Sequence, residues 1–124
     1  MPPHSDYPIV LIVEDEPLIC EIAAEEFEEA GYQVLTAMDA GSALSILASE
    51  QCIDLLFTDI RIPGTLDGWG VARTARRLRP ALPVIYATGF SAEQIQMVEG
   101  ARFFRKPYRV TAIIDAAREL VKAA

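Results

Sequence analysis

Five short apolar runs alternate with segments of helical periodicity along the sequence. The first run, Ile9 to Val13, is continuously apolar, as expected for a strand that is covered on both faces. The segment after it repeats apolar residues at helical spacing from Leu18 until Gly31 stops the helix. Repeated strand–helix units in a chain of 124 residues predict one α/β domain, with a parallel sheet and helices on both faces.

The boundaries of the elements follow from these patterns and from turn residues. The expected strands are 9–13, 33–37, 55–58, 83–87 and 102–105. The expected helices are 18–30, a helix over Ala43 to Leu47 capped by Asp39 or Ser42, a helix from Gly68 to Leu78 that Pro80 ends, a short helix capped by Ser91, and 110–121.

Four of the expected strands end at polar side chains. Glu14 and Asp15 follow the first strand, Asp59 closes the third run, Thr88 the fourth, and Lys106 follows the fifth. Each of these patterns is by itself common in surface turns, helix caps or loop starts. Their occurrence together, each at the end of a strand, favours a shared site. The carboxyl ends of parallel strands share one edge of the sheet, where α/β folds place their ligand sites.

The grouped side chains have the chemistry of a phosphoryl-transfer site. Glu14, Asp15 and Asp59 offer the carboxylate oxygens that Mg²⁺ prefers, and a cation would relieve their mutual repulsion. The ammonium of Lys106 can pair with carboxylates or with phosphate, and Thr88 adds a hydroxyl donor. Such groups stabilise the oxygens of a transferring phosphoryl group, and a carboxylate can act as the nucleophile to give an aspartyl-phosphate.

Several motifs together resemble the receiver domain of bacterial two-component response regulators. The resemblance covers nearly the whole chain, from Tyr7 to Val121, and implies a flavodoxin-like fold of five βα units with strand order 2-1-3-4-5. The motifs that carry it are VEDE at 13–16, FTDIRIPG at 57–64, DG at 67–68, ATG at 87–89 and FFRKPY at 103–108.

The resemblance also implies a role for each site residue. Asp59 would be the phosphoacceptor, and Glu14, Asp15 and the main-chain carbonyl of Arg61 would hold Mg²⁺ together with it. Lys106 would contact the phosphoryl group. The chain would then be a signalling domain rather than an enzyme, catalysing only its own phosphoryl transfer and dephosphorylation, with a sensor histidine kinase as donor and an unidentified output or phosphotransfer protein as target.

A switch is implied on two neighbouring strands. Thr88 would also contact the phosphoryl group and move toward it on phosphorylation, and the aromatic ring of Phe103 would turn inward behind it. A core strand residue is the alternative for Phe103, and Phe104 should then point to the opposite face of the sheet. The family pattern further implies a cis peptide bond at Lys106–Pro107.

Two loop lengths depart from the family pattern. The stretch 63–68 is one residue longer than usual, and 88–106 is several residues shorter, so the helix between the fourth and fifth strands must be short or irregular. The sequence YATGF at 86–90 is similar to the Phe-Ala-Thr-Gly strand end of a stand-alone receiver subgroup often paired with HWE-type kinases, with Tyr86 in place of Phe.

The residues argue against two other functions. A receiver-like adaptor would bind partners without phosphorylation, and the complete set of carboxylates, Thr88 and Lys106 argues against it. An aspartate-nucleophile phosphatase usually carries a second Asp two residues after the first, where this chain has Arg61. Arg73, Arg76, Arg77 and Arg79 are expected to form a solvated helix face, with partner contact as the alternative.

Composition limits the remaining classes. A net charge of −7 and a pI of about 4.6 argue against nucleic-acid binding. No apolar run approaches the roughly 20 residues of a membrane span, and the first residues have no signal-peptide character. Cys20 and Cys52 lie in apolar patterns and are expected to be reduced core thiols. We expect a cytoplasmic protein with a flexible tail at 1–6, a receiver domain at 7–124 and little room for an effector domain.

Overall fold

The computed structural model describes residues 7–89 and 96–123 of the chain. These residues form one sheet of five strands in the order β2-β1-β3-β4-β5, and every neighbouring pair is parallel. The expected fold class and strand order are therefore confirmed. The elements are β1 (Ile9–Val13), α1 (Pro17–Glu29), β2 (Gln33–Ala37), α2 (Ala40–Ala48), β3 (Leu55–Asp59), α3 (Gly68–Leu78), β4 (Val84–Thr88), β5 (Arg102–Arg105) and α4 (Val110–Ala123).

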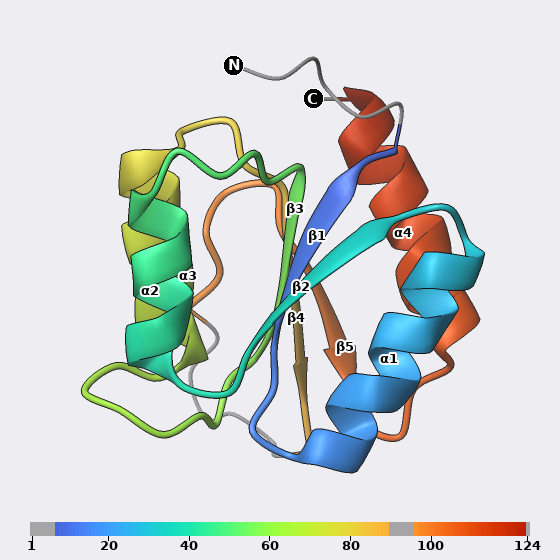
Figure 1. Ribbon diagram of the computed structural model, residues 1–124, viewed down its shortest axis with the longest axis horizontal. Helices are drawn as coiled ribbons and strands as arrows, with labels where there is room; N and C mark the ends of the chain where they lie inside the picture. The colour runs from blue at the N-terminus through green and yellow to red at the C-terminus, as the bar shows by residue number, and fades with distance from the viewer. Residues whose placement is uncertain (1–6, 90–95, 124) are drawn as a thin grey trace.

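The helices cover the sheet from both sides (Figure 1). Helices α1 and α4 lie on one face, and α2 and α3 lie on the other. Successive strand residues point to opposite faces, so Leu11 and Val13 pack with α2 and α3, whereas Val10 and Ile12 pack with α1 and α4. Continuous apolar strands are needed because both faces are buried.

Two strands extend one residue beyond their expected ends. β3 continues to Asp59, which lies in register with Ala87, and β4 continues to Thr88, which lies in register with Arg105. The main-chain ladder thus includes the polar residue at the end of each strand. Strand propensity alone does not predict the extension of β3 to Asp59, because Asp is depleted in strands.

Aspartate side chains cap two helices on the α2–α3 face. Asp39, and not Ser42, caps α2 by accepting a hydrogen bond of 2.7 Å from the Ser42 amide. Asp67 caps α3 in the same way by accepting one of 2.9 Å from the Gly70 amide. Both caps satisfy amides that have no partner within the helix.

The helix expected between β4 and β5 falls largely on residues that the structure does not describe. Its expected cap, Ser91, and the motif residue Phe90 lie outside the described ranges, as does the tail at 1–6. The described part that follows, from Gln96 to Val98, is not helical. Among the described helices, none has the length and apolar character that crossing a bilayer requires.

Gly68 allows α3 to begin directly against the end of β3. Its amide donates a hydrogen bond of 2.7 Å to the Ile60 carbonyl. A Cβ atom on Gly68 would overlap the Asp59 carbonyl oxygen and lie 2.6 Å from the Ile60 Cα. These are backbone atoms of a buried strand end, so they cannot move aside without displacing Asp59.

We therefore expect Gly68→Ala to lower the free energy of unfolding by about 1–3 kcal/mol or more, because overpacking a buried site forces the backbone to shift. The matched control is Gly41→Ala in α2, where a Cβ would meet only the Asp39 carboxylate at 3.5 Å. That change should leave stability unaltered or raise it by less than about 1 kcal/mol. Urea unfolding of both variants measures the difference, and equal midpoints would contradict this account.

Candidate functional site

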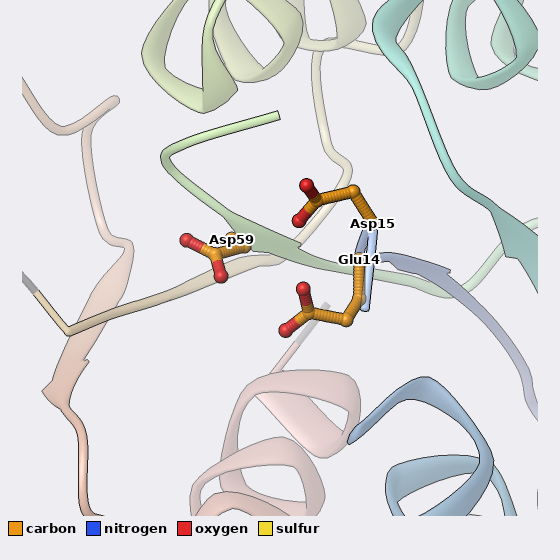
Figure 2. Close-up of side chains that lie close together, drawn as sticks. All are labelled: Glu14, Asp15 and Asp59. Carbon is orange, nitrogen blue, oxygen red and sulfur yellow. The ribbon is translucent and has the colours of Figure 1, made fainter. Parts of the chain in front are cut away.

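Three carboxylates converge at the carboxyl edge of the sheet (Figure 2). Glu14 and Asp15 follow β1, and Asp59 ends β3, the strand next to it. One oxygen from each side chain lies within 4.8 Å of the others. Glu14 and Asp59 are only 5% and 9% exposed, so their charges are partly removed from water. This cluster matches the expected metal-ligand set.

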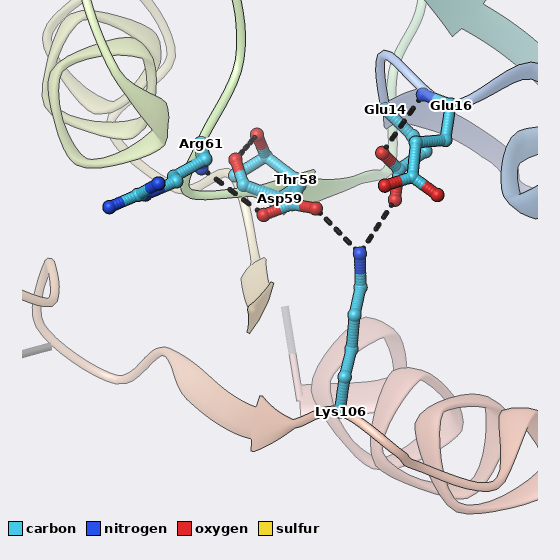
Figure 3. A network of polar contacts seen from close by, with 6 residues as sticks. All are labelled: Glu14, Glu16, Thr58, Asp59, Arg61 and Lys106. Atoms are coloured by element: carbon cyan, nitrogen blue, oxygen red, sulfur yellow. Dashed lines mark hydrogen bonds and ion pairs between the residues drawn. The ribbon is translucent and has the colours of Figure 1, made fainter. Parts of the chain in front are cut away.

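The ammonium of Lys106 joins two of these carboxylates (Figure 3). Its Nζ donates to Asp59 Oδ2 at 2.7 Å and to Glu14 Oε1 at 3.1 Å. The main-chain amide of Lys106 donates to the Thr88 carbonyl at 2.8 Å, which places the residue beyond the end of β5. Its long side chain can then reach the end of β3 two strands away.

Main-chain amides fix the carboxylates from the other side. The Arg61 amide donates to Asp59 Oδ1 at 3.1 Å, and the Glu16 amide donates to Glu14 Oε2 at 3.2 Å. The Thr58 hydroxyl donates to the Asp59 carbonyl at 2.7 Å. The contact of Glu16 could not be predicted from the sequence, because a main-chain donor carries no residue-type signal. Thr58 lies inside the predicted strand, where its hydroxyl gave no signal of a contact with the site.

The charges of the site do not balance without a cation. Lys106 pairs with two of the three carboxylates, Glu14 and Asp59, so one ammonium faces three negative charges. Burial raises the pKa of Glu14, and the nearby Asp59 charge adds to this, whereas the Glu16 amide and Lys106 oppose it. Burial alone would lower the pKa of Lys106, but its hydrogen bonds to Asp59 and Glu14 raise it strongly.

The donor set fits a hard divalent cation. Mg²⁺ binds oxygen ligands at about 2.1 Å, so opposite ligands lie about 4.2 Å apart. The three carboxylate oxygens lie within 4.8 Å, so small side-chain rotations bring them to that spacing. Their charge excess and the burial of Glu14 and Asp59 make the cluster suitable for a divalent cation such as Mg²⁺.

The expected switch residues lie next to the site on β4 and β5. Thr88 is the buried last residue of β4. Phe103 packs on the α2–α3 face, and Phe104 packs on the opposite face, as expected. The Phe103 ring stacks on Trp69, with centroids 6.0 Å apart and planes 10° apart. The cis peptide bond at Lys106–Pro107 is also confirmed.

Comparison with known proteins gives one family. Residues 10–118 match the model described as the response regulator receiver domain. The chain is 33% identical over 84 residues to the sensor histidine kinase RcsC of Salmonella typhimurium, covering 68% of this chain but only 9% of that kinase. The chain therefore spans a small part of that relative.

Solved structures agree with this result. A response regulator receiver protein from Sinorhizobium medicae is 29% identical, with a TM-score of 0.91 and coverage of 95% of this chain and 97% of that one. The response regulator TrrA from Thermotoga maritima, solved in complex with Mg²⁺ and BeF, is 28% identical, with a TM-score of 0.82 and coverage of 91% and 98%.

The raised pKa of Glu14 leads to a pH-dependent prediction in Mg²⁺-free buffer. Because the folded chain binds the Glu14 proton more tightly than the unfolded chain, this residue's contribution to stability falls as the pH rises through its folded pKa. In Glu14→Gln this fall is absent. We expect the stability of the variant, relative to that of the parent chain, to increase as the pH rises above the usual carboxyl range of about pH 4.

Urea midpoints at pH values from about 4 upward, measured with a chelator present, provide the test. Glu21→Gln, an exposed change on α1, corrects for the general loss of one negative charge. Parallel pH profiles for Glu14→Gln and the parent chain would show that burial does not raise the pKa of Glu14.

Proposed function

The chain belongs to the response regulator receiver domain family, and we propose that it accepts a phosphoryl group on Asp59. Receiver domains are phosphoacceptor signalling modules of two-component and phosphorelay systems rather than enzymes. The observation that carries the proposal is the position of the Asp59 carboxylate, which belongs to the acidic cluster and accepts a hydrogen bond of 2.7 Å from the Lys106 ammonium. Glu14 shares these neighbours but follows β1, whereas Asp59 ends β3.

In the proposed reaction one Asp59 carboxylate oxygen forms a new P–O bond, and the bond from phosphorus to the donor breaks, with its electron pair leaving on the donor. The Arg61 amide, 3.1 Å from Oδ1, keeps the carboxylate oriented. Lys106 changes its partner from the carboxylate to the phosphoryl oxygens, since an ammonium can pair with either. Thr88 donates its hydroxyl to the same oxygens.

Glu14, Asp15 and Asp59 would hold Mg²⁺, together with the main-chain carbonyl of Arg61. When bound, the ion neutralises charge that develops on the phosphoryl oxygens. Two features of this chain support that assignment: the carboxylate oxygens lie within 4.8 Å of one another, and their negative charge exceeds that of Lys106.

Phosphorylation would then switch a partner-binding surface through Thr88 and Phe103. A phosphate adds about −1.5 to −2 charges near neutral pH, and Thr88 lies where it can respond. Phe103 is on the next strand and stacks on Trp69, at the start of α3. Because Trp69 follows Gly68, which packs against the Asp59 carbonyl, the aromatic pair is also connected to the acceptor strand.

A histidine kinase is the proposed donor. RcsC, a sensor histidine kinase, is among the relatives, and the YATGF motif favours an HWE-type kinase. An apolar hollow of about 260 Å³ adjoins Lys106 and is lined by residues of α1 and the start of α4, among them Ile22 and Val110. We propose that a donor domain approaches Asp59 over this hollow, and that the chain acts in the cytoplasm through a domain spanning 7–124.

The acceptor assignment predicts a single labile modification. With Mg²⁺ and a small phosphodonor such as acetyl phosphate, the intact protein should gain the mass of one phosphoryl group and lose it in alkali, as an acyl phosphate does. Asp59→Asn should gain none. Asp115→Asn, an exposed change on α4, should be phosphorylated like the parent chain. A full mass gain in Asp59→Asn would refute the assignment.

The metal assignment predicts a fluorescence response from Trp69. This ring is 4% exposed and packs near the acceptor strand, so Mg²⁺ followed by beryllofluoride should change its emission in a saturable way. Asp15→Asn should weaken Mg²⁺ binding by about tenfold or more, since it removes one charged ligand. Glu16→Gln, the matched neighbour, should titrate like the parent. Equal Mg²⁺ affinities for these two variants would exclude Asp15 as a ligand.

A further inference from the structure

The two halves of the sequence carry opposite charge. All 11 Lys and Arg residues lie at position 61 or later, whereas 13 of the 18 Asp and Glu residues precede it. In the fold this separates helices: α1 contains glutamates and no basic residue, whereas α3 contains arginines and no acidic residue. A chain with net charge −7 therefore presents a local basic surface on α3.

This basic surface borders a groove. The groove, of about 650 Å³, lies between α3 and the connection that leads into β5, which runs beside α3 in Figure 1. Leu66, Pro80 and Val98 supply apolar lining, and Arg73, Arg76 and Arg77 supply the charge. None of the residues of the proposed phosphorylation site lines it.

Arg73 and Arg77 are exposed, as expected for a solvated face, but hydrogen bonds hold Arg73 and Arg76 against the connection that leads into β5. Arg76 donates from Nε to the Leu82 carbonyl at 3.0 Å and from Nη1 to the Glu99 carbonyl at 2.8 Å. Arg73 donates from Nη1 to the Gln96 side chain at 2.9 Å. These bonds fix the guanidinium groups before any ligand binds, which reduces the entropy lost on binding.

Among the described residues, these arginines donate hydrogen bonds to neutral groups. Within residues 7–89 and 96–123, Arg73, Arg76 and Arg77 form no ion pair with any carboxylate. Arg77 donates to Thr74 Oγ1 at 3.2 Å, which is a neutral partner. A guanidinium has five N–H donors, so each arginine keeps donors for an anionic ligand.

The far wall of the groove is fixed to the sheet. The Tyr86 hydroxyl, from the centre of β4, accepts a hydrogen bond of 3.0 Å from the Val98 amide. Tyr86 is fully buried and packs on Trp69, with ring centroids 4.7 Å apart. A Phe at position 86 would lack this hydroxyl, so the position of Val98 in the groove depends on the Tyr that replaces the Phe of the related motif.

We propose that this groove binds an acidic peptide segment of a partner protein. Carboxylates of the segment pair with Arg73 and Arg77, and an apolar side chain between them packs on Leu66 and Val98. The concave, partly apolar lining can take an apolar side chain between two carboxylates, which favours a peptide over the phosphate backbone of a nucleic acid. Binding of the acidic α1 face of a second copy would be a head-to-tail contact, which builds rings or open filaments and would therefore be detected as self-association.

The test uses the unphosphorylated, Mg²⁺-free chain labelled with ¹⁵N, so its outcome does not depend on phosphorylation of Asp59. The probe is a capped peptide in which Leu alternates with pairs of Glu, and the control peptide has Gln at every Glu position. We expect saturable amide shifts at Gly70, Thr74 and Val98 with the acidic peptide and none with its Gln form. No saturable shifts up to millimolar peptide, or shifts confined to α1 or α4, would overturn the proposal.

Matched charge variants decide whether the groove is responsible. Arg73→Gln with Arg77→Gln should weaken peptide binding by about tenfold, as expected for the loss of two partly exposed charge pairs. Arg109→Gln with Arg118→Gln removes the same charge at exposed positions elsewhere and should change affinity by less than about twofold.

Three outcomes would overturn the peptide assignment. Equal weakening in both double variants would indicate non-specific electrostatic attraction. Displacement of the peptide by a DNA duplex at equal charge concentration would indicate a general polyanion site. Self-association in sedimentation experiments that Arg73→Gln with Arg77→Gln abolishes would assign the groove to a second copy of this chain.

Discussion

The ion pair of Lys106 with Asp59 and Glu14 is the interaction on which the site depends. It connects the ends of β1, β3 and β5 across the carboxyl edge of the sheet, with distances of 2.7 and 3.1 Å. One ammonium cannot neutralise three carboxylates, so the site retains negative charge. This excess explains why the same residues are suited to Mg²⁺ and why a phosphoryl group can attract Lys106 to a new partner.

The fold restricts how the acceptor carboxylate can move. Asp59 is in the β-ladder opposite Ala87, and Gly68 packs directly on its carbonyl. The ring after Gly68, Trp69, contacts both Tyr86 and Phe103. A change at the acceptor can therefore reach the β5 edge through packed groups, because close-packed interiors transmit small displacements.

The short connection between β4 and β5 gives this receiver a distinct surface. The described residues from Gln96 to Val98 are not helical, and side chains from α3 and β4 hold this connection in place. The resulting arginine-lined groove lies on the opposite face of the sheet from the apolar hollow beside Lys106. Two surfaces of different chemistry would allow the proposed kinase and the proposed acidic partner to bind at separate places.

Sequence alone predicted most of the fold. The apolar runs predicted the three central strands, β1, β3 and β4, which are buried throughout because helices cover both of their faces. The edge strands β2 and β5 are shorter apolar runs with exposed residues. The order of polar strand ends, with its resemblance to receivers, placed Glu14, Asp59 and Lys106 together. The strand order came from that resemblance, since periodicity does not specify which strands are neighbours.

Local details depended on tertiary contacts. The choice of Asp39 over Ser42 as the α2 cap, the extension of β3 to Asp59, and the bond from Val98 to the Tyr86 hydroxyl all follow from groups that are distant in sequence or from main-chain geometry. The sequence determined which chemistry is present and at which strand ends. Only the tertiary structure decided that the α3 arginines bind the β5 connection and border a groove, because that contact joins residues 23 positions apart.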